Sequence, residues 1–446
     1  MSPAAPPPRS PLKYLGDGLS GLPWASDRNG LYIKAVQLAA AVLVGVLSYG
    51  YAGLISATQG FFLFAFHGHT WLAALAAPLV FLGSTWLVVR FAPEAHGSGI
   101  PQVLRIIEDS DRPRSVLNPL VSVKTAAFKA LSTALGTLGG ASIGREGPTV
   151  QIAASAFAFA AQKARLYFGL ADFRSFLVAG AAAGIAAAFN TPLAGITFAL
   201  EEIAEATFTQ FKRVVMLSVI VAGITAQALG GNYLYFGHPL IPVLSSSILP
   251  FALVIGLAGG LGGGFFARVL TSPFNGLLPR RWWTRALACG VFCSALALLT
   301  HGVTTGSGYE ATRHFMDDPD GRLSPLFFAE KFLATVFSYM SGMAGGIFSP
   351  CLSIGAGMGF TLAHLFHVPD LRACALIGMV AFFSGVVQTP LTAVIIITEM
   401  TDQSSLLIPF LIAAFVAHGV GKLIMPVPLY RTLANRAAAL ADPPSA

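Results

Sequence analysis

Three features of the sequence predict an all-α protein that crosses a membrane many times: scarce charge, long charge-free runs and an internal repeat. Asp, Glu, Lys and Arg make up 11% of the 446 residues and hydrophobic residues 55%, whereas a soluble domain has roughly 25% charged residues. A soluble fold of this length still exposes a large surface to water, so it could not hide so much apolar area. The composition also excludes disordered, coiled-coil and disulfide-rich secreted proteins.

The charge-free runs indicate where helices cross the membrane. They are 35–89, 175–200, 214–267, 286–309, 332–369, 374–398 and 403–421. A spanning helix needs about 20 apolar residues, so the runs 35–89 and 214–267 each have room for two spans. We expect the first run to break near residues 67–69 and the second around 230–232 and 237–239, where Gly, His and Pro gather.

Other runs are interrupted by Gly and Pro within ten or fifteen residues, as at 190–192, 345–350 and 388–390. Such breaks predict short or discontinuous helices, about 16 to 18 in total, several of them ending inside the bilayer. Non-helical backbone at membrane depth survives only when it is packed in protein or lines a polar cavity. The interrupted segments are therefore the first place to look for a site.

The two ends of the chain predict its orientation. Residues 1–30 are expected to form a disordered cytoplasmic tail, since 1–12 are rich in Pro and lack the apolar core of a signal peptide. The basic residues before the first span are Arg9, Lys13, Arg28 and Lys34. Basic residues stay on the cytoplasmic side, so we expect a cytoplasmic N-terminus and, after an unstructured tail at 437–446, a cytoplasmic C-terminus.

An internal repeat divides the chain into two halves. Residues 190–201 align with 388–399 at an offset of 198, and residues 140–154 align with 342–356 at an offset of 202. We expect the first transmembrane repeat over residues 31–240 and the second over residues 241–436. Repeated halves with interruptions at matching places indicate a binding site at the repeat interface, near the bilayer midplane. The residues alone leave open whether the second half is inverted.

Charge, cysteine and histidine content indicate no further ligand. The net charge of +7 is ordinary for basic cytoplasmic loops, so no nucleic-acid partner is expected. The four cysteines form no CxxC pair and are expected to be small buried apolar residues. His67 and His69 have no carboxylate or cysteine nearby, so we expect no metal and no cofactor.

Three glycine-rich turns carry the chemistry: GSGIP at 97–101, GREGP at 144–148 and GGIFSP at 345–350. Each ends in Pro, which suits the first turn of a helix. A helix N-terminus points free N–H groups outward and carries about half a positive charge, which makes it an anion site. Three such ends would hold a small anion weakly enough for it to leave again. The alternative for any one of them is a tight turn or close helix packing.

Four side chains in or near these segments are candidates for function. Ser98 offers a hydroxyl donor, and Tyr430 offers a phenol, although its place near a membrane boundary favours an interface anchor. Glu146 lies in apolar sequence, where a carboxylate is a functional hypothesis by default. When ionised it could occupy the anion site, and when protonated leave it, coupling anion to proton movement. The alternative is a structural pair with Arg145. Taken alone, Glu201, Glu202 and Glu205 indicate a solvated helix end.

The ordered set GSGIP, GREGP and GIFSP resembles the CLC family of chloride channels and chloride/proton antiporters, and the resemblance spans residues 35–436. The segment 180–202, GAAAGIAAAFNTPLAGITFALEE, is similar to the family segment that ends in its inner proton-transfer glutamate. The resemblance implies a CLC-type fold, which we expect to contain two inverted halves. It also implies a homodimer with one ion pathway per subunit. A bacterial-type protein of the inner (plasma) membrane is expected, since no nucleotide-binding regulatory domain is seen.

The resemblance also assigns roles to individual residues. The expected anion-binding residues are Ser98 and Tyr430 through their side chains and Gly147, Ile347 and Phe348 in the motif backbones. Glu146 would be the external gating glutamate, and Glu202 the internal proton acceptor. Gln102 follows GSGIP where many members have Glu, which touches no ion ligand.

The leading interpretation is a chloride/proton antiporter that is not an enzyme. The alternative within transport is a passive chloride channel, against which Glu202 argues. An alternative from another class is an intramembrane hydrolase with Ser98 as nucleophile and His96 or His301 as base, which requires a serine–histidine contact. Segments 190–208 and 388–410 are expected to build the subunit interface.

Overall fold

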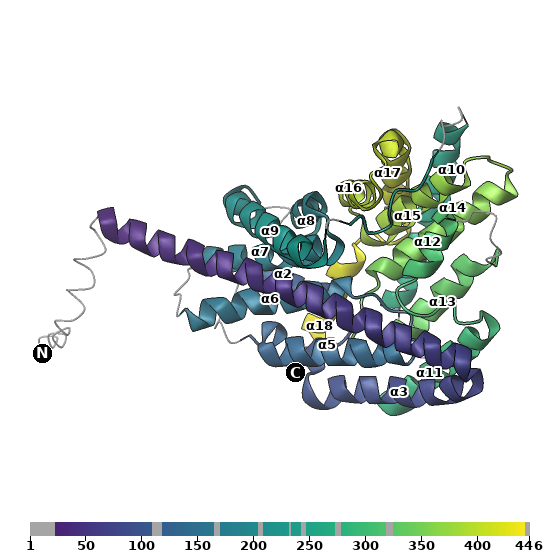
Figure 1. The fold of residues 1–446 in the computed structure, drawn as a ribbon, viewed down its shortest axis with the longest axis horizontal. Coiled ribbons are helices and arrows are strands. Elements are labelled where there is room, and N and C mark those ends of the chain that lie inside the picture. Colours follow the sequence, from purple (N-terminus) through teal and green to yellow (C-terminus); the bar gives the residue numbers. More distant parts are fainter. Residues whose placement is uncertain are drawn as a thin grey trace, which may run out of the picture.

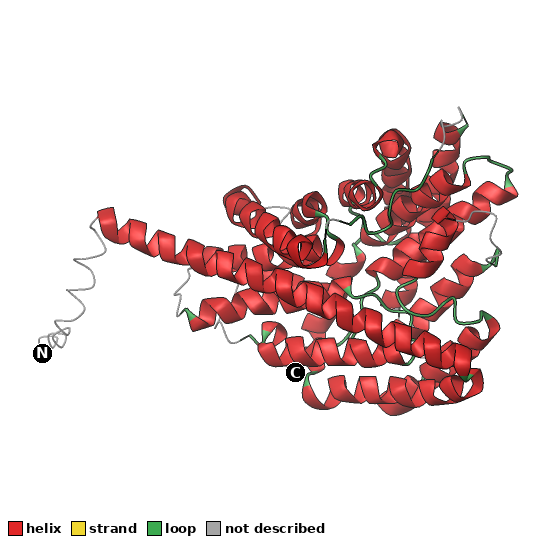
Figure 2. Ribbon diagram, in the orientation of Figure 1, coloured by secondary structure: helices red, strands yellow, loops and turns green. Residues whose placement is uncertain are grey.

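The computed structural model describes residues 23–108, 118–164, 170–203, 208–231, 233–241, 247–272, 278–317 and 324–441. These residues form seventeen α-helices, α2 to α18, and no strand (Figure 2). The predicted all-α architecture of 16 to 18 helices is therefore confirmed. Some of the sequence-based predictions involve residues outside the described ranges, namely Arg9, Lys13, Glu205 and Asn232.

Figure 1 labels the helices in chain order. The first eight are α2 Pro23–Gly68, α3 Thr70–Phe91, α4 Ile100–Glu108, α5 Val123–Leu138, α6 Glu146–Lys163, α7 Leu170–Phe189, α8 Pro192–Phe198 and α9 Phe208–Gly230. The others are α10 Ile248–Thr271, α11 Trp282–Leu299, α12 Tyr309–Asp317, α13 Phe327–Met340, α14 Phe348–Leu365, α15 Leu371–Val387, α16 Pro390–Thr401, α17 Leu407–Ile424 and α18 Leu429–Ala441. A π-helical turn, Ala199–Ile203, extends α8.

Long apolar helices occur where the charge-free runs predict them. Six helical segments are long and apolar enough to cross a membrane, among them Gly30–Gly68, Thr70–Phe91 and Ile248–Thr271. The break between α2 and α3 falls at His69, as predicted, and the gap between α9 and α10 contains both predicted breaks. Helices α4, α8 and α12 have nine, seven and nine residues, too few to span the bilayer. Discontinuous helices are thus confirmed.

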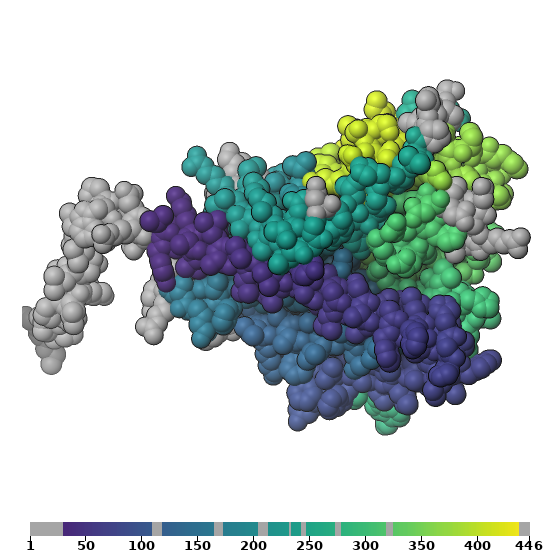
Figure 3. Space-filling view, in the orientation of Figure 1, coloured from purple at the N-terminus to yellow at the C-terminus, as the bar shows by residue number. Residues whose placement is uncertain are grey.

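The surface of α2 and α3 suits lipid rather than water. Figure 3 shows α2 (purple) crossing this face of the molecule. Phe64 is 79% exposed, and Trp71 and Leu75 are each 73% exposed. In contrast, the interior contains many helix contacts through small residues. A Cβ atom on Gly378 of α15 would overlap the Gly355 carbonyl of α14, so these helices approach as closely as backbones allow, which is typical of membrane bundles.

Equivalent helices of the two halves pack alike. Helix α6 packs on α5 and α7, as α14 packs on α13 and α15, and helices α8 and α16 pack against each other across the halves. At this last contact, Glu399 accepts hydrogen bonds from the first N–H groups of α8, and Glu201 accepts them from the first N–H groups of α16. Because each helix caps the start of the other, they run antiparallel, as inverted halves require.

One expectation about single residues needs correction, and the structure adds detail to a second. The pair Glu201 and Glu202 is not a solvated helix end, because Glu201 caps α16 and Glu202 is 2% exposed. Within the segment expected at the subunit interface, Ile396 is fully buried in its own subunit, whereas Leu391 is 44% exposed. Period 3.6 explains this, since residues five apart lie on different faces of a helix. The four cysteines are free and buried, as predicted.

Candidate functional site

The three glycine-rich turns meet in the centre of the molecule and are joined by backbone hydrogen bonds. The Gly97 N–H donates to the Met343 carbonyl at 3.1 Å, and the Gly345 N–H donates to the Gly97 carbonyl at 3.0 Å. Gly144 and Gly346 exchange two bonds of 2.7 and 2.8 Å in an antiparallel bridge. Gly144 and Gly346 are equivalent positions of the repeat. Because they pair with each other, the local two-fold axis that relates the two halves passes through the site.

Each turn leads directly into a helix. Helix α4 begins at Ile100, α6 at Glu146 and α14 at Phe348, and the first N–H groups of a helix have no acceptor within it. The turns pack so tightly that a Cβ atom on Gly147 would overlap the Ser98 hydroxyl. A Cβ atom on Gly346 would lie 3.1 Å from the Gly147 nitrogen. The structure thus brings the starts of three helices together, as the motifs predict.

Three buried polar side chains lie at this centre without hydrogen-bond partners. Ser98 is 1% exposed, and Glu146 and Tyr430 are fully buried. Within the part of the chain that the structure describes, the Ser98 Oγ, the Tyr430 hydroxyl and both Glu146 carboxylate oxygens make no hydrogen bond. Helix α18, which has Tyr430 in its first turn, packs on α4, which begins two residues after Ser98. Buried hydroxyls normally have partners, so unused donors mark a place that favours an anion.

The interface-anchor interpretation of Tyr430 is therefore wrong. The ring stands in the first turn of α18, completely enclosed by protein. An anchor would expose its phenol at the headgroup level. Hydropathy could not show this, because a tyrosine near the last span looks alike in both cases.

The start of α14 completes one side of the centre. Ile347 and Phe348 are fully buried, and the Phe348 ring packs against Phe383 and Phe189 at centroid distances of 4.2 and 5.1 Å. This aromatic packing fixes the first turn of α14, so its N–H groups point in a set direction. It also gives the site an apolar wall.

Glu146 occupies the position where both ions could act. Its carboxylate lies against Gly144 of its own turn, while the Arg145 Nε atom stands 4.0 Å from the Glu146 Oε1 atom. The predicted pairing with Arg145 therefore exists as a long ion pair. The Arg145 guanidinium also lies over the Tyr235 ring, 5.7 Å from its centroid. Arg145 is thus held between the Glu146 carboxylate and the Tyr235 ring.

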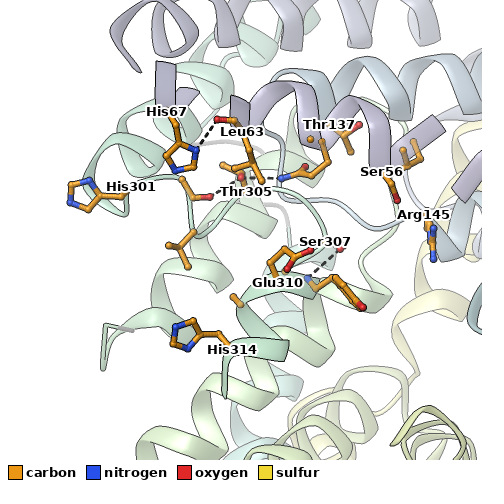
Figure 4. Close-up of a pocket in the computed structure, with 18 of the residues that line it drawn as sticks. Ser56, Leu63, His67, Thr137, Arg145, His301, Thr305, Ser307, Glu310 and His314 are labelled. Atoms are coloured by element: carbon orange, nitrogen blue, oxygen red, sulfur yellow. Dashed lines mark hydrogen bonds between the residues drawn. The ribbon is translucent and has the colours of Figure 1, made fainter. Parts of the chain in front are cut away.

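A cavity of about 580 Å³ adjoins Arg145. Figure 4 shows polar residues around it from the last turns of α2, from the loop before α12 and from α12 itself, together with Thr137 of α5 and Arg145. His67 bonds the Leu63 carbonyl at 2.8 Å, and the Tyr309 N–H donates to the Ser307 hydroxyl at 3.3 Å. Glu146 is linked to this polar cavity through its neighbour in sequence, Arg145.

Glu202 and this cavity lie toward opposite ends of the molecule. The cavity adjoins the C-terminal end of α2. Near the N-terminal end of α2, Gln37 donates to the Val214 carbonyl and to Ser218, both at 2.8 Å. These residues belong to the first half of α9, which starts six residues after Glu202.

Two buried lysines were not identified as site residues from the sequence. The Lys129 ammonium donates to the carbonyls of Ala95 at 2.7 Å and Gly97 at 2.8 Å, and so holds the turn that carries Ser98. The Lys331 ammonium donates to the carbonyls of Thr304 and Gly306, each at 2.8 Å. Both lysines are 0% exposed. Their separation of 202 residues equals the repeat offset, a signal that could have identified them.

The hydrolase alternative lacks its required contact. Ser98 bonds no histidine within the described residues. His301 is exposed and lines the outlying cavity, and the His96 carbonyl accepts a bond from Gln102 at 2.5 Å. No nucleophile–base pair is formed at this serine.

Comparisons with known proteins agree with this geometry. The family model described as "Voltage gated chloride channel" matches residues 79–422. The H+/Cl− exchange transporter ClcA of Yersinia pestis is 31% identical over 459 aligned residues, covering 94% of this chain and 92% of the relative. ClcA of Salmonella paratyphi A is 29% identical, covering 93% and 91%.

Two solved structures share the fold. The crystal structure of a slow cyanobacterial Cl−/H+ antiporter superposes with a TM-score of 0.79 at 25% identity, covering 91% of this chain and 97% of that one. A CLC-type fluoride/proton antiporter superposes with a TM-score of 0.76 at 24% identity, covering 92% and 98%.

The lysine that holds the Ser98 turn gives a stability prediction. Lys129→Met should lower the free energy of unfolding by about 2–4 kcal/mol, because buried carbonyls lose a charged donor. The measurement is the thermal unfolding midpoint of purified protein in detergent, followed by intrinsic fluorescence. Lys124→Met, an exposed change on the same helix, is the control and should leave the midpoint unchanged. Equal midpoints for both variants would contradict the role of Lys129.

Proposed function

The chain belongs to the voltage-gated chloride channel (CLC) family, and we propose that it is a secondary antiporter that moves chloride across a membrane in exchange for protons. The observation that carries this proposal is the buried Glu146 carboxylate at the meeting point of three helix N-termini. One place then serves an anion and a proton in turn. The relatives named as H+/Cl− exchange transporters and the antiporter structure support exchange over a passive channel.

Chloride would be held by neutral donors. We propose the Ser98 and Tyr430 hydroxyls as side-chain ligands and Gly147, Ile347 and Phe348 as backbone ligands. Lys129 adds positive charge near the Ser98 turn, but its hydrogen bonds go to carbonyls. Binding without a contacting cation stays weak enough for release.

Proton coupling would follow from competition at Glu146. The ionised carboxylate and chloride repel each other. When the carboxylate itself occupies the chloride position at the donors, it therefore excludes chloride from them. Protonation removes its charge and frees the donors for chloride. We propose that Glu202 passes protons from the opposite side of the molecule, consistent with its burial and its position before α9.

The expected topology assigns sides to this path. With a cytoplasmic N-terminus, the C-terminal end of α2 and the cavity beside Arg145 face the outside, and Glu202 lies on the cytoplasmic side. The cavity would be the outer mouth of the pathway. We propose the bacterial inner membrane as the location, with both termini in the cytoplasm.

We also propose a homodimer through α8, α9, α16 and α17. Large apolar side chains on these helices are exposed in the single subunit: Leu193, Ile224, Leu391 and Ile408 are 59%, 59%, 44% and 63% exposed. Leu193 and Leu391 are equivalent in the repeat, so they present similar surfaces on either side of the α8–α16 contact. Association in lipid depends on such shape-matched packing.

The dimer surface can be tested with paired substitutions. Leu193→Trp combined with Leu391→Trp should favour monomers, because the larger rings disturb matched packing at an exposed face. Subunit counting by single-molecule photobleaching in lipid bilayers measures the result. Leu75→Trp, on the exposed face of α3, is the control and should remain dimeric. A full dimer yield from the double variant would show that another face is used.

The two glutamates should separate chloride from proton transport. Glu146→Gln mimics the protonated carboxyl permanently, so chloride flux should persist without pH dependence and without proton pumping. Glu202→Gln keeps the gate titratable, so chloride flux should stay pH-sensitive, while proton flux should fall about tenfold or more, as expected when a proton-transfer group is lost. The assay is proton uptake driven by a chloride gradient in liposomes. Robust pumping by Glu202→Gln would remove this residue from the proton path.

Ser98 should influence anion selectivity. Ser98→Pro removes a hydroxyl and a backbone N–H beside the proposed chloride position. Family members with Pro at this position look nitrate-preferring. We expect stronger coupling of nitrate to protons and a reduced preference for chloride over nitrate. Paired flux measurements with the two anions test this. An unchanged preference would argue against Ser98 as a ligand.

A further inference from the structure

The Glu201 carboxylate has a structural task separate from anion binding. One of its oxygens accepts the Leu391 N–H at 3.1 Å, and the other accepts the Thr392 N–H at 2.6 Å and the Thr392 hydroxyl at 2.7 Å. These donors form the first turn of α16, in the other half of the chain. A carboxylate on a helix N-terminus forms charge-assisted hydrogen bonds and complements the helix dipole.

The mirror contact makes the same use of Glu399. Its two oxygens accept the N–H groups of Leu193 at 3.1 Å and Ala194 at 2.8 Å, at the start of α8. The residues before the two helices, Thr191 and Thr389, are the usual type for an N-cap. Their hydroxyls make no cap bond, and neither has a partner in the described residues. Each helix therefore depends on the glutamate of the other for its N-terminal cap.

The two capping glutamates differ in their next neighbour along the chain. Glu201 precedes Glu202, whereas Glu399 precedes Met400. Glu201 and Glu202 lie in the π-helical turn Ala199–Ile203, while α16 is α-helical throughout. Single π-helical turns are rare and occur frequently at functional sites. The asymmetry of an otherwise mirrored contact thus coincides with the proposed proton acceptor.

We propose that Glu201 is a positioning residue that fixes Glu202 by fastening the π-helical turn to the start of α16. The proposal rests on the proposed function of Glu202 in proton transfer. Three hydrogen bonds hold the residue directly before Glu202 against the other half of the molecule. Proton transfer requires groups within hydrogen-bond reach, directly or through one water, so a loosened turn should slow proton movement while leaving the anion donors in place.

The test compares the two mirrored caps in liposomes. Glu201→Gln should lower the proton flux per chloride by about threefold to tenfold, since an amide loses the charge and one acceptor. Glu399→Gln removes the cap at the start of α8 but leaves the hydrogen bonds that hold Glu201, the residue next to Glu202, so its proton-to-chloride ratio should equal that of the unmodified protein. Both variants should lose similar thermal stability. An equal fall in the ratio for both would show a structural role only and overturn the proposal.

Thr392→Val separates positioning from charge. It keeps the Glu201 carboxylate but removes one of its three donors, so the proton-to-chloride ratio should fall about twofold. Thr398→Val is its control, because the Thr398 hydroxyl bonds only the Val394 carbonyl of its own helix. If Glu201→Gln lowers the ratio and Thr392→Val does not, the lost charge is the cause and positioning is refuted. Where Glu201→Gln does not assemble, Thr392→Val decides alone.

The proposed function is checked in the same assay. If the unmodified protein moved chloride without protons, antiport itself would fail, and the role of Glu201 with it. A second outcome would separate the two proposals. If the unmodified protein pumps protons and Glu202→Gln does not, antiport through Glu202 stands. If Glu201→Gln and Thr392→Val then keep the original proton-to-chloride ratio, only the positioning role of Glu201 fails.

Discussion

The structure depends on the need to satisfy backbone polar groups where no water is available. An unpaired N–H or carbonyl in hydrocarbon costs several kcal/mol, yet three turns of this chain interrupt helices in the buried interior of the molecule. Four backbone hydrogen bonds between the turns offset most of that free-energy cost, because they satisfy N–H and carbonyl groups of the turns. The donors that remain are the first N–H groups of α4, α6 and α14, with the Ser98 and Tyr430 hydroxyls beside them. An anion is the ligand that such a set of neutral donors suits best.

The internal repeat supplies the same solution twice and uses it differently. A Gly-Ser-Gly turn at 97–99 is held by Lys129, and a second one at 306–308 is held by Lys331. All four glycines have positive φ angles between 63° and 106°. In the second copy the Ser307 hydroxyl accepts the N–H of its own helix start. In the first copy the Ser98 hydroxyl has no partner among the described residues, so it is the one able to serve an ion.

Coupling in this arrangement is a matter of placement. Glu146 stands in the first turn of α6, where the three glycine-rich turns meet, and Arg145 beside it leads to the polar cavity. Glu202 lies toward the other end of the molecule, in a segment fastened to the opposite half through Glu201. The proposed pathway would therefore have a carboxylate on each side of the proposed chloride ligands, with no cation in contact with the ion.

The sequence by itself determined the fold class, the broken helices, the repeat and three of the site segments, because these are local: charge-free length, Gly-Pro interruption and motif order act within about 20 residues. It also identified Glu146 as a candidate from its apolar surroundings alone. Only the tertiary structure decided which residues face each other. In the structure, Tyr430 and Ile396 are fully buried, and Glu201 caps the start of α16. Two lysine ammonium groups donate to carbonyls about 30 residues away in sequence. Such contacts join groups far apart along the chain, and hydropathy treats a buried, paired charge and a solvated one alike.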